Sequence, residues 1–439
     1  MALDPGFVAH AAYVHTDVGA ALAFVVVLLL AARAVSAATL SGWLALGLAL
    51  GLALVTKFST VLLVPVVALA PLLAVLPLGE RGASAVGSRA LRDRFVGAVA
   101  ALGLAAIVVH GVYAFTLRRM TPESAEAAIR SYLEGRGATP DEVRLHSDLS
   151  RLSPPLGHYL GGLRGVLLLS ERGRGANWFR GATSDRPFPL FFPAAFLLKS
   201  TPAFLVLLAG ALALGLRRAR RARSVPLPRE ATLGVLLALL VAAGYFASSV
   251  RSAFNIGARH LLPVWALLAL AAAVVVARAL ERRPALRAGV VLAVVASAGI
   301  SLASARTSPI AYFNVLAGGP EGGRRWFSDS SVDWGQDLLR LHRFLEARGW
   351  EETTTIVAYG GVATNYYSRS CRLLDPSKPF GPGRYAVSHM METLGEPFVR
   401  EFAGEAAARQ VAELVRALKA RGRRVALVGG SITIWDLPG

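Results

Sequence analysis

A small set of polar side chains stands beside long apolar segments of the chain, where charge is costly. The set holds one carboxylate, three cations, three histidines and an asparagine: Asp17, Lys57, Lys199, Arg259, His10, His15, His260 and Asn255. Polar groups next to lipid need a compensating role, so each is a candidate for function. Cations and histidines around one acid, at a single membrane depth, predict a site for an anionic substrate at the interface.

Asp17 and the two lysines also have structural interpretations. Asp17 follows His15 and Thr16 at the start of an apolar segment, where a capping carboxylate is favoured, and capping is compatible with substrate binding. Only four of the 47 basic residues are lysines, and Lys57 and Lys199 both end apolar segments. Snorkelling or helix capping would explain them, as would phosphate binding by a compact charge.

Two further clusters invite functional hypotheses. The segment 255–263 (NIGARHLLP) places Arg259 at a helix entrance, where a planar guanidinium and a helix N-terminus both suit phosphate; anchoring at the membrane surface is the alternative. Asp329, Asp333 and Asp337 are spaced by four and would repel on one helix unless a cation lay there. We expect the earlier of these acids to lie in a loop and Asp333 to lie near a helix N-terminus. Whether a divalent metal binds here stays undecided.

Apolar segments must position these residues. Hydrophobic residues make up 54% of the 439-residue chain, more than soluble domains average, and they gather in blocks long enough to cross ~30 Å of hydrocarbon. No Walker, dinucleotide-binding, zinc or Ser-His-Asp motif is present. We predict about eight transmembrane helices. Their ranges are 18–38, 40–55, 59–78, 95–115, 189–216, 231–249, 260–280 and 286–305.

The arginines predict the orientation of these helices. They crowd the connections 79–94, 217–230 and 278–287, which are every second connection, so one topology places all of them in the cytoplasm. Residues 1–17, the loop 116–188, the turn 250–259 and the segment 307–439 then lie outside. Because topology explains the net charge of +19, we do not expect a nucleic-acid partner.

Two regions follow from this pattern: a transmembrane region, 1–306, and an extracytoplasmic α/β domain, 307–439. In the second we predict helices at 333–347 and 405–420 and strands at 353–359, 385–388, 425–428 and 432–435. The loop 116–188 reads as an irregular amphipathic lid with a helix at 124–134, broken at Ser153-Pro-Pro, Gly173 and Gly175.

Six segments in order resemble the GT-C superfamily of integral-membrane glycosyltransferases, in particular bacterial protein O-mannosyltransferases and aminoarabinose transferases (glycosyltransferase family 39-like). The resemblance covers nearly the whole chain. The segments are 3–17 (LDPGFVAH leading into HTD), 51–59 (GLALVTKFS), 191–199 (FFPAAFLLK), 254–263 (FNIGARHLLP), 311–320 (AYFNVLAGGP) and 329–338 (DSSVDWGQDL).

The resemblance implies transfer of a sugar from a polyprenyl-phosphate donor to an acceptor protein, lipid or glycan on the outer face of a bacterial inner membrane. It places Lys57, Lys199, Arg259 and His260 at the donor phosphate, with His10, His15 and Asn255 beside them. Asp17 matches the second acidic position of the family, with its role unassigned. Family members carry earlier spans and a first outer loop with the principal catalytic acid, so we expect an N-terminal truncation.

A transporter of an anionic solute or lipid is the alternative function. Such a protein would show charged or broken helices near the bilayer midplane and a repeated half. The charges here fall at the outer ends of the segments, and no repeat is visible in the sequence.

Overall fold

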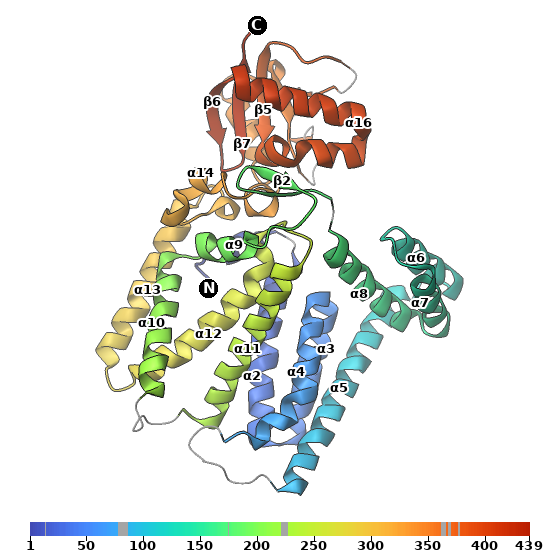
Figure 1. Ribbon diagram of the computed structural model, residues 1–439, viewed down its shortest axis with the longest axis vertical. Helices are drawn as coiled ribbons and strands as arrows, with labels where there is room; N and C mark the ends of the chain where they lie inside the picture. The colour runs from blue at the N-terminus through green and yellow to red at the C-terminus, as the bar shows by residue number, and fades with distance from the viewer. Residues whose placement is uncertain are drawn as a thin grey trace.

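Apolar helices form most of the chain, and a domain built on a mixed sheet covers one end of them (Figure 1). The computed structural model describes residues 1–439 except 14, 78–86, 174, 221–226, 361–365, 368–369 and 376–377. The predicted class, a helical membrane protein with a small C-terminal sheet domain, agrees with this architecture.

Six helices within the described residues are long and apolar enough to cross a membrane, and a bent pair makes up to seven. The six are α2 (Thr16–Ala37), the segment η1–α4–η2 (Phe58–Val75), α5 (Ser88–Leu117), α11 (Arg229–Arg251), the segment η3–α12 (Ala258–Ala279) and α13 (Pro284–Ser304). The apolar helix α3 (Leu40–Thr56) has 17 residues, which is shorter. The number of spans therefore stays a prediction.

The region expected as one helix at 189–216 is two helices bent by 104°, α9 (Phe191–Lys199) and α10 (Pro202–Ala219). Pro202 lacks a backbone N–H and restricts the residue before it, so the helix breaks there. Asn314 occupies carbonyls that the break exposes, donating to Leu197 O at 2.7 Å and to Ser200 O at 2.9 Å. The single-helix prediction is wrong because Pro202 ends the hydrogen-bond ladder.

Glycines bring α3 close to α5. A Cβ on Gly51 would lie 2.6 Å from Val108 Cβ and 3.1 Å from Ala105 Cα, and Gly47, one turn earlier, lies against the backbone of Ala101. Small residues four apart let helices approach closely, which is how apolar helices associate where no water drives them together.

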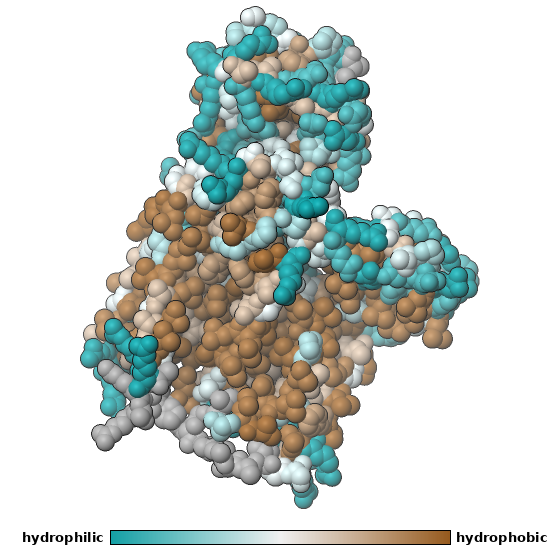
Figure 2. Space-filling model, in the orientation of Figure 1, coloured by the Kyte–Doolittle hydropathy of each residue, from teal (hydrophilic) through white to brown (hydrophobic). Residues whose placement is uncertain are grey.

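Basic residues lie at the end of the bundle opposite the C-terminal domain. Arg94 donates to Val35 O at 3.0 Å, and Arg229 donates to Ala74 O at 2.6 Å, so both satisfy carbonyls at helix C-termini. The helical flank between the two ends is largely apolar (Figure 2). This pattern, polar at both ends and apolar between, is that of a membrane protein.

The region 116–188 contains more regular structure than predicted. The expected helix at 124–134 is present as α6 (Pro122–Glu134), but α7 (Pro140–Leu152) and α8 (Pro154–Arg172) follow it. Pro140 and Pro154 begin helices, because proline fits the first helical position, and Thr139 with Glu142 forms a capping box. A short hairpin of β1 (Asn177–Phe179) and β2 (Ala182–Ser184) then leads to α9.

The C-terminal domain has a five-stranded mixed sheet in the order β4-β3-β5-β7-β6. Its strands are β3 (Thr354–Val357), β4 (Arg372–Leu373), β5 (Gly383–Ser388), β6 (Arg423–Val428) and β7 (Ile432–Leu437). One face packs on α15 (Leu338–Glu346) and the other on α16 (His389–Arg421), which is kinked at Gly404. Four of these strands match predicted ones, and the helix predicted at 405–420 is the second half of α16.

Two further predictions for this domain need correction. The helix expected from 333 begins at Leu338, since Asp337 is its N-cap residue and the side chain of Asp333 is turned to another helix. The first half of α16, over 389–403, was not predicted. Short elements join the domain to the bundle: η4 (Pro309–Ala311), η5 (Val315–Ala317), α14 (Gly319–Gly323) and η6 (Asp329–Ser331). A further turn, η7 (Glu351–Thr353), lies between α15 and β3, and α1 (Pro5–Ala12) precedes α2.

Candidate functional site

The structure brings Asp17, Lys57, Arg259 and His15 together at the end of the bundle that faces the C-terminal domain. Lys57 donates a hydrogen bond to Asp17 Oδ1. Arg259 Nη1 lies 3.9 Å from Asp17 Oδ2 and 3.2 Å from His15 Nδ1. The side chains of Asp17 and Arg259 are only 5% and 13% exposed. We call these four residues the rim cluster; it is a carboxylate with two cations in a largely dehydrated place.

Three helix ends position the rim cluster. Asp17 lies in the first turn of α2, and Lys57 follows the last residue of α3 with an extended backbone (φ −160°, ψ 135°). Arg259 lies in the single turn η3 that opens α12. Thr60 Oγ1 is 2.7 Å from Lys57 O, which fixes the turn after α3. Because α2 and α3 are consecutive and antiparallel, the start of one and the end of the other meet at the same end (Figure 1).

Three histidines with buried ring nitrogens, His15 among them, lie at this end of the bundle. The ring centres of His10 and His15 are 5.7 Å apart, and His260 packs edge-on against Phe254. Burial lowers the pKa of His10 to about 3, so it is neutral at physiological pH. Within the described part of the chain, His10 Nδ1, His15 Nε2, His260 Nε2 and Arg259 Nε are buried without a hydrogen-bond partner. Such unsatisfied groups are rare in stable cores, which marks this end of the bundle as polar and incompletely paired.

Lys199 and Asn255 are not brought into the rim cluster. Lys199 Nζ donates to Ile310 O at 2.6 Å and to Ser331 O, and it stands 4.0 Å from the ring centre of Phe313. Lys199 therefore braces the segment that follows α13.

Asn255 is placed at the hairpin of β1 and β2. Its Oδ1 accepts from Phe188 N at 2.5 Å, and its backbone N–H donates to Asn177 Oδ1 at 2.8 Å. These bonds give it the role of joining the turn before α12 to the hairpin.

A polar cavity lies against the rim cluster, and an apolar cavity lies near it. An apolar cavity of about 820 Å³ lies between α3, α4, α5 and α8, lined by Leu54 and Tyr159 among others. Leu54 precedes Lys57 by three residues, or ~4.5 Å along a helix axis. A more polar cavity of about 510 Å³ lies under the C-terminal domain, and Arg259 and Trp334 contribute to its wall. The Arg259 guanidinium stands 4.7 Å from the Trp334 ring centre. The rim cluster thus contacts a polar cavity and stands one helical turn from an apolar one.

The three spaced acids do not converge on a metal site. Asp333 is fully buried and accepts from Gly335 N at 3.1 Å and Met390 N at 2.9 Å. Asp337 accepts from Ser431 Oγ and Gly430 N, each at 2.9 Å. The described residues contain no group of three His, Cys, Asp or Glu side chains arranged for a metal ion.

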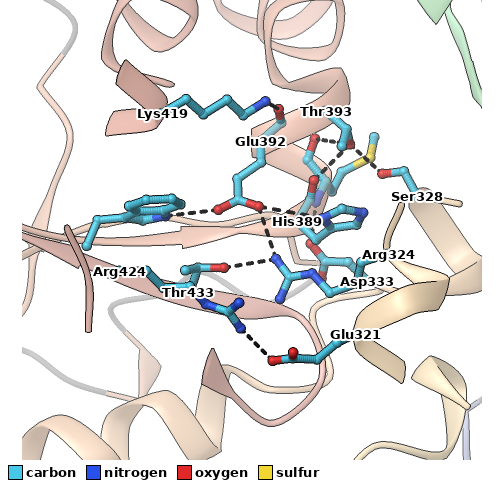
Figure 3. Close-up of polar contacts among 12 residues, drawn as sticks. Glu321, Arg324, Ser328, Asp333, His389, Glu392, Thr393, Lys419, Arg424 and Thr433 are labelled. Atoms are coloured by element: carbon cyan, nitrogen blue, oxygen red, sulfur yellow. Dashed lines mark hydrogen bonds and ion pairs between the residues drawn. The ribbon is translucent and has the colours of Figure 1, made fainter. Parts of the chain in front are cut away.

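A buried charged network that was not predicted from the sequence joins Arg324, just after α14, to α16 and β7 (Figure 3). Arg324 Nη2 donates to Glu392 Oε2 at 3.0 Å and to Thr433 Oγ1 at 2.9 Å, and Trp435 Nε1 donates to Glu392 Oε1 at 3.0 Å. His389 Nδ1 lies 3.6 Å from Glu392. We call these five residues the Arg324–Glu392 network. It fixes the start of α16 on the loop that carries Trp334.

The electrostatics of this network stabilise the charged form of Glu392. Burial by itself raises its pKa, but the neighbouring His389 and the charge of Arg324 outweigh burial and lower the pKa to about 2. Burial lowers the pKa of Arg324, which keeps its charge nonetheless.

Sequence reasoning missed the residues that wall the polar cavity from the domain side, in particular Tyr359 and Phe398. No local pattern in the sequence indicated these two residues, because the cavity is formed by segments far apart in the chain. In comparisons with protein-family models, with curated proteins and with solved structures, none matches this chain.

Proposed function

We propose that this chain is an integral-membrane glycosyltransferase that takes a sugar from a polyprenyl-phosphate donor and passes it to an acceptor on the non-cytoplasmic face. The observation that carries the proposal is the rim cluster, in which Arg259 lines a polar cavity and Lys57 follows, by one helical turn, a residue that lines an apolar one. A lipid phosphate has the matching shape: an apolar chain, an anionic head and a polar sugar beyond it.

The charges of the rim cluster suit a lipid phosphate. Lys57 and Arg259 carry two positive charges, and Asp17 carries one negative charge. Burial, and then the charge of Arg259, lower the pKa of His15, so His15 adds no positive charge near pH 7. The remaining positive charge attracts an anion, and at low hydration its effect is strong. Arg259 offers planar donors to phosphate oxygens, and Lys57 a compact charge.

In the proposed reaction the bond between the anomeric carbon and the phosphate oxygen breaks as an acceptor oxygen bonds to that carbon. The acceptor loses its proton to a base, and polyprenyl phosphate departs with the electron pair of the broken bond. Lys57 and Arg259 stabilise the charge on the departing phosphate, which is where preorganised cations contribute most. Asp17 holds the two cations in position.

The arrangement of the helices supports an orientation. We infer eight spans, with α3 as a short one and α9–α10 as a bent one, and an extracytoplasmic C-terminal domain at a bacterial inner membrane. Arginines gather at the end opposite the domain, which the positive-inside rule assigns to the cytoplasm.

Transport of an anionic solute or lipid is the second candidate, favoured by the bent pair α9–α10. Transporters often bind their substrates at broken helices near the midplane. This break instead lies at the end of the bundle beside the C-terminal domain, and Asn314 occupies carbonyls that would be free to bind a solute (Figure 1). The glycosyltransferase is therefore the better-supported proposal.

Binding of undecaprenyl phosphate to the purified chain in nanodiscs, followed by native mass spectrometry, tests the proposal. We expect Lys57→Met and Arg259→Met each to weaken binding roughly 10- to 100-fold, since a charged hydrogen bond contributes about 1.5–3 kcal/mol. Arg306→Met is the matched control, because Arg306 is an exposed cation just after α13.

Two results would overturn the proposal. One is undecaprenol, which lacks the phosphate, binding as tightly as undecaprenyl phosphate. The other is an equal affinity of all three variants. Accumulation of phosphate in proteoliposomes, lost in the Arg259 variant, would instead favour the transporter.

A further inference from the structure

A row of aromatic rings crosses the polar cavity from the rim cluster outward. Trp334 lies beside Arg259, and the Trp334 and Tyr359 ring centres are 5.8 Å apart. Tyr359 and Phe398 follow at 5.2 Å, and Phe398 and Phe402 at 4.8 Å. All four rings line the cavity. The row therefore joins the proposed reaction site to the outside.

The outer end of the row is exposed to an unusual degree. Phe402 is 69% exposed, and Phe398 and Tyr359 are half-buried. A phenylalanine in water lacks the stabilisation that burial would give it, about 1.5–3 kcal/mol. Clustered apolar rings at the mouth of a polar cavity indicate a surface that a ligand covers.

Charged groups flank the rings. Arg172 and Glu401 line the same cavity, as does Arg136, whose carbonyl lies 3.4 Å from Arg172 Nη1. The wall thus combines flat apolar faces with hydrogen-bonding groups at their edges. A sugar ring has the complementary chemistry: its C–H faces pack on aromatic faces while its hydroxyls, at the ring's edge, bond to charged side chains.

Other ligands fit this wall less well. An acyl chain would cover the exposed side chains of Arg172 and Glu401 with hydrocarbon and offer them no hydrogen bonds, at a cost. A cavity of about 510 Å³ falls in the range of small-molecule sites, ~300–1,000 Å³, and is too small for a folded protein domain.

We infer that the polar cavity is the acceptor site and that the acceptor is a carbohydrate, held on the faces of Tyr359, Phe398 and Phe402. This inference rests on the proposed glycosyltransferase function, and it names the class of acceptor. The sugar reaches the cavity either as part of a soluble glycan or as the headgroup of a glycolipid. Trp334 contacts Arg259, so we assign it to the donor side of the cavity.

Saturation-transfer NMR on the full chain in nanodiscs tests this inference. The probes are chitobiose, maltotriose and the methyl glycosides of mannose, glucose and arabinose. We expect at least one to bind, and the double variant Phe398→Leu, Phe402→Leu to lower its affinity at least tenfold while preserving apolar bulk. Phe402→Trp keeps an aromatic face and should retain binding. Tyr366→Leu is the matched control, because Tyr366 is 77% exposed in the same domain and does not line the cavity.

The outcomes separate this inference from the function on which it rests. Absence of binding by every probe, or equal affinity in the wild type and the double leucine variant, overturns the carbohydrate site. If undecaprenyl phosphate still binds those preparations, the proposed function survives alone. Tighter binding of the same sugar as a glycolipid headgroup than as a free saccharide assigns the source to the membrane, and the reverse assigns it to a soluble glycan. Competition by laurate, but by no sugar, refutes the inference.

Discussion

Replacing Glu392 by glutamine tests whether the Arg324–Glu392 network stabilises the C-terminal domain. The pKa of Glu392 falls from 4.5 to about 2 in the folded chain, which corresponds to about 3 kcal/mol of stabilisation at neutral pH. Removing one partner of a buried ion pair costs ~3–5 kcal/mol, which agrees with that figure. We expect Glu392→Gln to destabilise the domain by about 3 kcal/mol.

Hydrogen exchange at pH 7, followed by mass spectrometry on the full chain, measures this loss locally. A loss of about 3 kcal/mol raises the exchange rates of the β7 amides roughly 100-fold, where local unfolding limits exchange. Glu396→Gln is the matched control: Glu396 lies one turn later on α16, and its side chain is 46% exposed and paired with Arg400. We expect the control to change stability by less than ~0.5 kcal/mol. Equal exchange in the two variants would refute the reasoning.

The pH dependence gives a second test of the same network. A carboxyl whose folded-state pKa is lowered stabilises the fold above its unfolded pKa, and this contribution is lost as pH falls toward the folded value. Between pH 7 and pH 3 the wild type should lose about 2 kcal/mol of the Glu392 contribution. The difference between wild type and Glu392→Gln in urea denaturation, followed by tryptophan fluorescence, should therefore narrow from about 3 to about 1 kcal/mol. A constant difference would contradict the assigned pKa.

Three further predictions concern the bundle and its orientation. Gly51→Leu should destabilise the chain by ~1–3 kcal/mol in thermal melts in nanodiscs, because α5 leaves no room for a side chain, whereas Gly103→Leu, in open space, should not. Lys199→Met should cost about 1–3 kcal/mol for each carbonyl left without its donor, with undecaprenyl phosphate binding by the folded fraction unchanged; a tenfold loss of binding would contradict the bracing role. Cys371, the one cysteine in the sequence, should react with an impermeant maleimide in intact spheroplasts. Arg282→Cys in a Cys371→Ser background should react only after permeabilisation, and the reverse result would invert the orientation.

Apolar length predicted most of the helices of the bundle, because a helix in lipid must satisfy its backbone internally and each span leaves a long apolar signal. The same reasoning failed at α9–α10, where the apolar run continues through Pro202 and composition conceals the break. It also failed at α7, which was not predicted, and at α8, whose initiating prolines after Ser153 were interpreted as a break although proline suits the first turn of a helix.

The candidate site could be predicted in part. Asp17, Lys57 and Arg259 stand out because charges at the ends of apolar segments are rare, and the structure places them in contact. Lys199 gave the same signal, yet its partners are backbone carbonyls supplied by a segment more than a hundred residues away, at Ile310 and Ser331. The polar cavity is also formed by segments far apart in the chain, so no local sequence pattern indicated that Tyr359 or Phe398 would line it.

The helix α8 has a mechanical consequence for any ligand bound at either end. Its N-terminal half, with Tyr159, borders the apolar cavity, and its C-terminal half, with Arg172, borders the polar one. It is one uninterrupted helix of 19 residues, about 28 Å long. A rod of that length tilts as a unit, so a molecule that pushes on one half also displaces the other. Filling one cavity would therefore change the dimensions of the other, because α8 lines both.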